Sequence, residues 1–323
     1  MKNDIRTVLL LLCTVSVVLS RELLQKANDY YHANNFTRAV KTYYRALQAG
    51  ENPALVYFNL GNAYYQIDSI AKAIVCYQSS IEEAPEFFRA YLNLGILYYN
   101  LDDMASAIAT LERADALEPD NVQVMLILAS AYKNLHEYSV AVPLLERVLE
   151  LDPKNGDCYF LLYEINRRIG DLHEAKQWLE RYPGNGRRIA DKYQLLGELA
   201  EETGDMSEAG YYYNQLITIA PERKWAYYQL IRILSAGGNV LTALQKADLA
   251  LERYNDFGEL ALLAGNIAFE HKYFTKAKKY YMSAYRTGRG SGLVGLQNLI
   301  RYYSSLGDEK SVSEINACIV AGK

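Results

Sequence analysis

The chain has 323 residues, a formal net charge of −4 and a sequence in which half of the residues are hydrophobic. With only seven prolines, this composition excludes an intrinsically disordered chain. No basic stripe stands out that could neutralise phosphates, so the charge argues against a general nucleic-acid binder.

The first twenty residues differ from the rest of the chain. Lys2 and Arg6 precede an uncharged, apolar-rich run over residues 8–20. This run is short for a membrane span, and it fits the apolar core of a secretory signal peptide. We therefore predict that residues 1–20 are cleaved and that the mature chain begins near Arg21.

Three alternatives for this segment stay open. Residues 1–20 could form an uncleaved membrane anchor, the chain could be lipidated at Cys13, or the protein could be an ordinary cytosolic one. The signal peptide, the anchor and the lipidated chain all predict an exported protein that is periplasmic, secreted or membrane-associated through residues 1–20, and this is the location that we expect.

A block of 34 residues then repeats eight times without insertion or deletion. The copies begin at Ser20, Ala54, Phe88, Val122, Gly156, Ala190, Lys224 and Gly258, and a ninth copy fits from Leu293. Apolar residues at positions four, seven, eight and eleven of each copy follow helical spacing, and a second apolar set recurs around positions twenty, twenty-four and twenty-seven. Position twenty is alanine in all eight copies, which lets two helices approach closely.

A short breaker lies between the two apolar sets of a copy. It reads Gly170-Asp171, Gly204-Asp205, Gly238-Asn239 or Asp102-Asp103 in different copies. Gly and Asn tolerate the turn conformations that end a helix. Each copy is therefore predicted to be two helices joined by a tight turn, and proline at position thirty-two, as in Pro85, separates the second helix from the next copy.

The pattern, length and punctuation of these copies resemble tetratricopeptide repeats. The segment from Tyr57 to Tyr65, followed later by Ala84 and Pro85, is similar to the consensus of that family. The resemblance covers residues 20 to about 320. It implies an all-α, right-handed α-solenoid of about nine helix-turn-helix repeats over residues 21–323, with a concave groove built by the first helix of each repeat. The same segment also resembles exported bacterial tetratricopeptide proteins of aerotolerance gene clusters.

The fifth copy departs from this pattern. Tyr163 replaces the small residue at position eight, and a Pro-Gly-Asn-Gly sequence at residues 183–186 cuts the second helix short. In a solenoid, stability is a sum of repeat terms and neighbour terms. We predict a soft joint near residues 183–188 that divides the array into two halves.

The last predicted helix, over residues 312–320, is apolar apart from Glu314 and a few small polar residues. One face can bury itself on its own repeat, and the other would then meet water. We predict that this face is covered by a second copy of the chain or by a partner. A tighter fold of the last repeat onto itself is the alternative.

The groove face in the resembled family is the stripe at positions two, five, nine and twelve of the first helices. Tyrosine recurs here at position twelve in three consecutive copies, and asparagine at position six borders the stripe. Such a surface can stack apolar side chains and hydrogen-bond an extended peptide backbone. We predict these partner-binding residues: Asn28, Tyr31, Phe58, Asn59, Asn62, Tyr65, Asn93 and Tyr99. Packing against the neighbouring repeat is the alternative role for the aromatic side chains.

Motifs for enzyme chemistry are not found in the sequence. The four histidines, His32, His136, His173 and His271, fall in four different repeats, and there is no CxxC pair, Gly-rich phosphate loop or Gly-x-Ser-x-Gly elbow. We expect no catalytic residue, no metal site and no cofactor. Cys76, Cys158 and Cys318 also lie in different repeats, so no intrachain disulfide is expected.

Two classes of function stay open. The first is a non-enzymatic interaction scaffold that binds a protein or an extended peptide in the groove outside the cytoplasm. The second is a component of an envelope complex that binds glycan or cell-wall fragments, because aromatic rings and asparagine also suit sugars. A continuous apolar floor would favour peptide, and isolated aromatic platforms ringed by polar groups would favour sugar.

Overall fold

The structure is a computed structural model and describes residues 18–184, 187–288 and 290–321. Every regular element of this described part is an α-helix, and it contains no strand. This confirms the prediction of an all-α chain of helix-turn-helix repeats. The helices form two compact units, a N-terminal unit that ends at Ile165 and a C-terminal unit that starts at Asn166.

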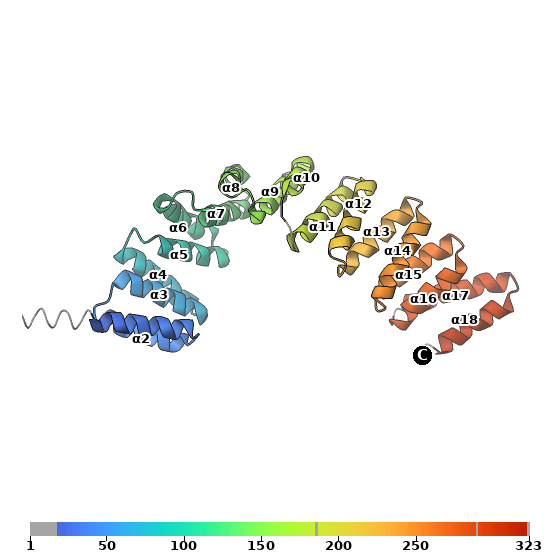
Figure 1. Cartoon of the computed structure of the whole chain (residues 1–323), viewed down its shortest axis with the longest axis horizontal. Coiled ribbons are helices and arrows are strands. Elements are labelled where there is room, and N and C mark those ends of the chain that lie inside the picture. The colour runs from blue at the N-terminus through green and yellow to red at the C-terminus, as the bar shows by residue number, and fades with distance from the viewer. Residues whose placement is uncertain (1–17, 185–186, 289, 322–323) are drawn as a thin grey trace, which may run out of the picture. The chain divides into compact units, whose positions relative to one another are not determined.

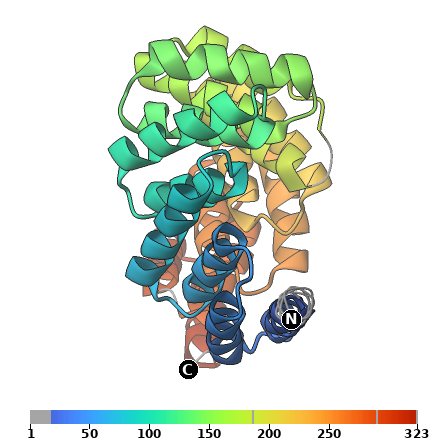
Figure 2. The same ribbon diagram turned by 90° about the vertical axis from the view of Figure 1, so that its left-hand side faces the viewer.

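Successive helix pairs correspond to the repeats of the sequence. In the N-terminal unit, helix 18–32 is followed by α2 (Phe36–Gln48), α3 (Pro53–Gln66), α4 (Ile70–Glu83), α5 (Phe88–Asn100), α6 (Met104–Leu117), α7 (Val122–Asn134) and α8 (Tyr138–Leu151). These helices stack in chain order (Figure 1, Figure 2). The boundary between the units falls within α9 (Gly156–Ile169).

The C-terminal unit continues with the same alternation of first and second helices. It contains α10 (Leu172–Arg181), α11 (Arg187–Glu202), α12 (Met206–Ile219), α13 (Lys224–Ala236), α14 (Val240–Arg253), α15 (Gly258–Glu270), α16 (Phe274–Arg286), α17 (Gly290–Ser305) and α18 (Glu309–Ala321). In the part of the chain that the structure covers, no helix is both long and apolar enough to cross a membrane. Residues 1–17 of the predicted signal peptide lie outside the described residues.

The two residues of each breaker pair have different roles in the turn between the helices. The first member takes a positive φ, 87° at Gly170 and 84° at Gly204. The second member begins the next helix: the Asp171 side chain accepts a hydrogen bond from the backbone N–H of Glu174. Asp205 accepts in the same way at the start of α12. A left-handed residue followed by an Asp or Asn cap therefore ends one helix and starts its antiparallel partner.

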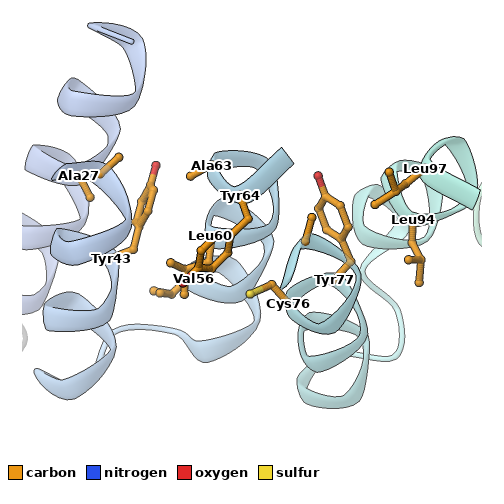
Figure 3. Packing of buried hydrophobic residues seen from close by; sticks show 12 residues of the cluster. Ala27, Tyr43, Val56, Leu60, Ala63, Tyr64, Cys76, Tyr77, Leu94 and Leu97 are labelled. Carbon is orange, nitrogen blue, oxygen red and sulfur yellow. The ribbon is translucent and has the colours of Figure 1, made fainter. Parts of the chain in front are cut away.

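Small residues bring the two helices of a repeat into close contact. All eight alanines at position twenty are fully buried: Ala39, Ala73, Ala107, Ala141, Ala175, Ala209, Ala243 and Ala277. At position eight, a Cβ atom on Gly61 would lie 2.6 Å from Cε1 of Tyr77, the residue at position twenty-four of the same repeat. Figure 3 shows this core, in which Tyr43 and Tyr77 recur with their hydroxyl groups directed to the same side.

A second set of tyrosines, at position eleven, joins consecutive repeats. The Tyr64 hydroxyl lies 3.3 Å from that of Tyr44 in the preceding repeat. The same twenty-residue spacing pairs Gln78 with Tyr98, and the Tyr132 hydroxyl donates to Glu112 at 2.7 Å. The tyrosines at position eleven therefore make contacts between consecutive repeats. They are distinct from the tyrosines at position twelve, which are predicted to line the groove.

The fifth repeat has the short second helix that its sequence predicts. α10 has 10 residues, against 13 or 14 in the other second helices. The Lys192 ammonium group on α11 donates to the carbonyl oxygens of Glu180 and Tyr182 at the end of α10. The predicted joint near residues 183–188 includes residues 185–186, which lie outside the described residues, and the compact units divide earlier, after Ile165. The joint stays a prediction.

Cys76, Cys158 and Cys318, the cysteines of the described residues, are free thiols. Burial raises the pKa of Cys76 to about 11 and that of Cys158 to about 12. Both thiols are therefore protonated at neutral pH and act as small core residues.

Candidate functional site

The predicted groove residues lie on three neighbouring first helices of the N-terminal unit. Asn28 and Tyr31 are on helix 18–32, Phe58, Asn59, Asn62 and Tyr65 on α3, and Asn93 and Tyr99 on α5. Residues three or four apart share a helix face, so Asn28 lies on one side with Tyr31, and Asn59 and Tyr65 lie on one side with Asn62, whereas Asn93 and Tyr99 are six residues apart on α5. Consecutive first helices place these sides next to each other.

Two adjoining pockets open on this face. The first, about 260 Å³, is lined by Tyr31, Asn62, Tyr65, Gln66, Tyr77, Asn93, Ile96 and Leu97. The second, about 300 Å³, is lined by Asn28, Tyr31, His32, Tyr43, Leu55, Asn59 and Asn62. Tyr31 and Asn62 line both, so the two pockets form one surface, which we call the groove. Six of the eight predicted residues line it.

Asn62 is held at the centre of the groove by two hydrogen bonds. Its Oδ1 accepts from the Tyr77 hydroxyl at 2.8 Å and from Nδ2 of Asn93 at 2.8 Å. Because both bonds use the oxygen, the orientation of the amide is fixed. Within the described residues, no hydrogen bond uses the Nδ2 group of Asn62, which leaves two N–H donors for a ligand.

The same arrangement occurs one repeat earlier. Oδ1 of Asn28 accepts from the Tyr43 hydroxyl at 2.7 Å, and Nδ2 of Asn59 lies 3.5 Å from it. The two sets are related by the 34-residue period. We call Asn28, Asn59, Asn62 and Asn93 the asparagine ladder.

The tyrosines that support the ladder stay protonated at every physiological pH. Burial raises the pKa of the Tyr77 hydroxyl, and burial is also the main cause of the raised pKa of Tyr43. Each hydroxyl is therefore a permanent hydrogen-bond donor to its asparagine. The ladder carries no charge and is not a pH switch.

The ladder ends at the third repeat. Ile96 occupies position nine there, and Leu111 replaces the tyrosine at position twenty-four. Ile96 and Leu97 add apolar side chains to the first pocket. The groove therefore combines amide groups from three repeats, the last of them Asn93, with apolar side chains at the third repeat.

Comparison with known proteins agrees with the repeat assignment. Two sequence models described as tetratricopeptide repeat match residues 88–121 and 190–223, and residues 24–74 and 127–188, which together exceed half of the chain. The chain belongs to the tetratricopeptide repeat family. Tetratricopeptide repeat proteins generally mediate protein–protein interaction and bind peptides.

Solved structures of tetratricopeptide repeat proteins are similar to this chain in fold. One, from Parabacteroides merdae, is 17% identical with a TM-score of 0.54 and covers 72% of this chain and 92% of its own. PilW, a type IV pilus biogenesis factor, is 20% identical with a TM-score of 0.51 and covers 67% and 98%. PilF of Pseudomonas aeruginosa is 18% identical with a TM-score of 0.51 and covers 64% and 94%. No curated protein matches the sequence.

Two of the predicted residues lie outside the pockets of this tetratricopeptide array. The Phe58 ring packs edge-to-face on Phe87 with the ring centroids 5.1 Å apart, and its centroid lies 6.1 Å from that of Tyr77. Tyr99 is partly buried against the apolar cluster of the third and fourth repeats. Both side chains contribute to packing between repeats, and their role in partner binding stays a prediction.

The structure adds groove residues that the sequence argument left out. Tyr43 and Tyr77 come from second helices, and they reach the groove between the two helices of their own repeats. The sequence argument considered only first helices. A usable signal was the pairing of a small residue at position eight with tyrosine at position twenty-four, as in Ala27 with Tyr43 and Gly61 with Tyr77.

Charged residues replace the amides in the sixth repeat of the C-terminal unit, whereas Asn266 of the eighth repeat keeps the bond from its tyrosine, Tyr281. The Tyr213 hydroxyl donates to Glu201 at 2.7 Å, three residues beyond the position that corresponds to Asn62, and Glu201 also pairs with Arg232 of the next repeat. Arg167 pairs in the same way with Glu202 at 2.9 Å. The Trp225 ring packs edge-to-face on Tyr213, with the centroids 5.3 Å apart. Within the described residues, no group of histidine, cysteine or carboxylate side chains could hold a metal ion.

Proposed function

We propose that this protein is a non-enzymatic interaction scaffold whose N-terminal unit binds an extended stretch of a partner polypeptide along the asparagine ladder. Amide side chains both donate and accept hydrogen bonds, which matches the alternating C=O and N–H groups of an extended backbone. The fixed amide of Asn62, with its Nδ2 directed away from its two partners, is the observation that carries this proposal.

The groove favours polypeptide over sugar because of its apolar end. Ile96 and Leu97 lie beside Tyr31 and Tyr65 in the first pocket, where an apolar side chain of the bound segment would be buried. Tyr65 is 42% exposed and is free to pack on that side chain. All residues that line the first pocket are uncharged, so the bound segment is uncharged where it meets the ladder.

The change Asn62→Asp tests the role of the ladder. Aspartate keeps both acceptor contacts of Asn62, replaces the Nδ2 donors by a second acceptor oxygen and adds a negative charge, which the control variant below also adds. Peptides selected by phage display on the wild-type protein should bind this variant more weakly by about 1 kcal/mol or more, measured by calorimetry. Asn266→Asp is the matched control, because Asn266 accepts the Tyr281 hydroxyl at 2.9 Å in the C-terminal unit. Equal losses in the two variants would show that the ladder is not the binding surface, and selection of cell-wall oligosaccharides instead of peptides would favour the glycan alternative.

We also propose that the protein works outside the cytoplasm. The support is the sequence of residues 1–20, with Lys2 and Arg6 before an uncharged apolar run. N-terminal sequencing of the native protein should begin near Arg21. A chain that starts at Met1 in the soluble cytosolic fraction would contradict export.

A further inference from the structure

One repeat lacks a side chain where the others have one. Position twenty-one of the first eight copies is occupied by Val40, Ile74, Ile108, Val142, Lys176, Gly210, Leu244 and Lys278. Val40 and Ile74 pack against the core of the N-terminal unit from this position. In the sixth copy, Gly210 on α12 leaves this place empty of side-chain atoms.

The surroundings of Gly210 would accept a side chain. A Cβ atom there would lie 3.4 Å from Cγ2 of Ile233 and 3.9 Å from Cδ1 of Leu230, at the distances of ordinary contact. The backbone of Gly210 does not have a positive φ. Neither close packing nor backbone conformation requires glycine here, in contrast to Gly61.

The space that a side chain at position 210 would occupy belongs to a pocket of about 510 Å³ within the C-terminal unit, which we call the Gly210 pocket. Its twelve lining residues are Met206, Ser207, Gly210, Tyr211, Asn214, Leu230, Ile233, Leu234, Gly237, Asn239, Thr242 and Lys246, from α12, α13, α14 and the turn before α14. This volume is in the range of sites that bind small molecules or anchor side chains. Leu230 and Ile233 are buried, whereas Met206 is 43% and Tyr211 57% exposed.

Lys246 is the only lining residue with a charge at neutral pH. Its ammonium group donates to Oδ1 of Asn214 at 3.0 Å, and within the described residues no carboxylate lies in salt-bridge distance of it. The neighbouring second helices differ, because Lys176 pairs with Glu208 and Lys276 with Asp248. The Gly210 pocket therefore combines an apolar wall with one cation that is available for an anionic group.

We propose that the Gly210 pocket is a second docking site, separate from the groove, for a leucine- to phenylalanine-sized side chain of a partner polypeptide that has a carboxylate beside it. The side chain fills the space that isoleucine or valine fills in other repeats. The carboxylate pairs with Lys246, and Ser207, Asn239 and Thr242 offer hydrogen bonds to the adjoining backbone.

The thioether methyl group of Met206 reports on this pocket. The chain has five methionines, of which Met104, Met125 and Met282 are buried elsewhere. In protein labelled with ¹³C at the methionine methyl groups, N-acetyl-leucine should shift the Met206 resonance saturably and leave the three buried methionines unchanged. N-acetyl-leucinamide, which has the same side chain and no carboxylate, should bind about fivefold more weakly.

Two variants separate the apolar wall from the charge. Gly210→Ile gives the sixth repeat an isoleucine at position twenty-one, as Ile74 gives the second repeat. The new side chain fills the pocket, so the saturable shift should disappear while the melting temperature stays the same or rises. Lys246→Gln should make the two probes bind equally, and Lys26→Gln, an exposed lysine of the N-terminal unit, is the charge control.

Three outcomes would overturn the proposal. The first is unchanged binding of N-acetyl-leucine to Gly210→Ile, and the second is equal binding of the two probes to the wild-type protein. The third is a saturable Met206 shift with decanoate but none with N-acetyl-leucine, which would identify an acyl chain as the occupant. The groove variant Asn62→Asp should bind N-acetyl-leucine like the wild type, so failure of the groove and failure of this pocket are distinguishable.

Discussion

The amide oxygens of Asn28 and Asn62 each have two hydrogen-bond donors from elsewhere in the fold. One donor is a tyrosine hydroxyl from the core of the same repeat, and the other is an asparagine of the next repeat. An amide held in this way loses little rotational freedom when a ligand binds, which reduces the entropic cost of association. The core therefore orients the groove through single hydroxyl groups.

We expect Tyr77→Phe to weaken both folding and ligand binding. The ring still fills its place against Gly61, but the hydrogen bond to Asn62 is lost, and its amide can rotate. The free energy of unfolding should fall by about 1 kcal/mol, measured by urea denaturation, and the affinity for groove peptides should fall as well. Tyr281→Phe removes the equivalent bond to Asn266 in the C-terminal unit. It should cost similar stability and leave peptide affinity unchanged, and an equal loss of affinity in both variants would contradict the role of Tyr77.

Substitution by alanine should change the stability of the protein in opposite directions at two helical glycines, Gly61 and Gly210. Gly61→Ala places a methyl group 2.6 Å from the buried Tyr77 ring, so overpacking should destabilise the protein by about 1–3 kcal/mol. Gly210→Ala meets only ordinary contacts and should stabilise it by about 0.5–1 kcal/mol, because alanine is less flexible than glycine in the unfolded chain. Thermal and urea unfolding of both variants measures the difference. The same sign in both would show that local space does not decide the effect.

At the scale of helices, α10 is the short element of the array. Its C-terminal carbonyl groups are held by the ammonium group of Lys192, and burial lowers the pKa of this lysine. A lysine that bridges the end of α10 and the start of α11 replaces the missing last turn of the helix.

Limited proteolysis should cut first near residues 183–188. Pro183 has no backbone N–H to donate. Lys192→Met removes both hydrogen bonds of the ammonium group and keeps the apolar stem, so it should speed up this cut several-fold. Mass spectrometry of the first fragments identifies the site. First cleavage in another turn, at the same rate in both proteins, would remove the case for a joint.

The last helix, α18, should mediate self-association or bind a partner. Ile315 is fully buried, whereas Val320 is 74% exposed at the end of the same helix. Sedimentation of the mature chain at micromolar concentration should show a dimer that Val320→Glu dissociates. Ile315 is unsuitable for this test because a charge there would disrupt the core. A monomer that the substitution does not change would contradict self-association through α18.

The helices and turns were predictable because they follow local rules that repeat. Asp171 and Asp205 each follow a glycine that ends the preceding helix, and both cap the next helix. The buried alanine at position twenty recurs in all eight copies. The location of the ladder asparagines on the groove face was also predictable, since they lie on or beside one stripe of the first helices, whereas their role in binding stays a prediction. The contribution of Tyr77 was not predicted from the sequence. Its hydroxyl reaches the groove across the helix pair, and the direction of this side chain depends on how closely Gly61 lets the two helices pack. The Gly210 pocket was missed for a related reason: it results from a side chain that is absent.

At the scale of the whole chain, the two units differ in the chemistry that joins consecutive repeats. The N-terminal unit uses neutral contacts between its first repeats, such as Asn62 with Asn93 and Tyr44 with Tyr64, and two ion pairs between its later repeats, Arg147 with Asp120 and Lys133 with Glu164. The C-terminal unit uses ion pairs between repeats: Arg167 with Glu202, Lys176 with Glu208, Arg232 with Glu201, Lys276 and Lys279 with Asp248, and Lys278 with Glu314. Such pairs contribute about 0.5 kcal/mol each near the surface, and salt screens them.

Raising the salt concentration from about 0.01 M to about 1 M should therefore loosen the C-terminal unit more than the N-terminal unit. Hydrogen exchange measured by mass spectrometry should show faster exchange in α12 to α16, with α3 to α6 little changed. Equal acceleration in both units would mean that the ion pairs do not hold the repeats together.

The edge-to-face contact of Trp225 with Tyr213 gives the molecule a built-in optical probe. The chain has two tryptophans, Trp178 and Trp225, and both lie in the C-terminal unit. Trp225 is 39% exposed and adjoins the tyrosine that donates to Glu201, which in turn pairs with Arg232. Tryptophan emission, excited where tyrosine does not absorb, therefore follows the loosening of the C-terminal unit alone, because the N-terminal unit contains no tryptophan.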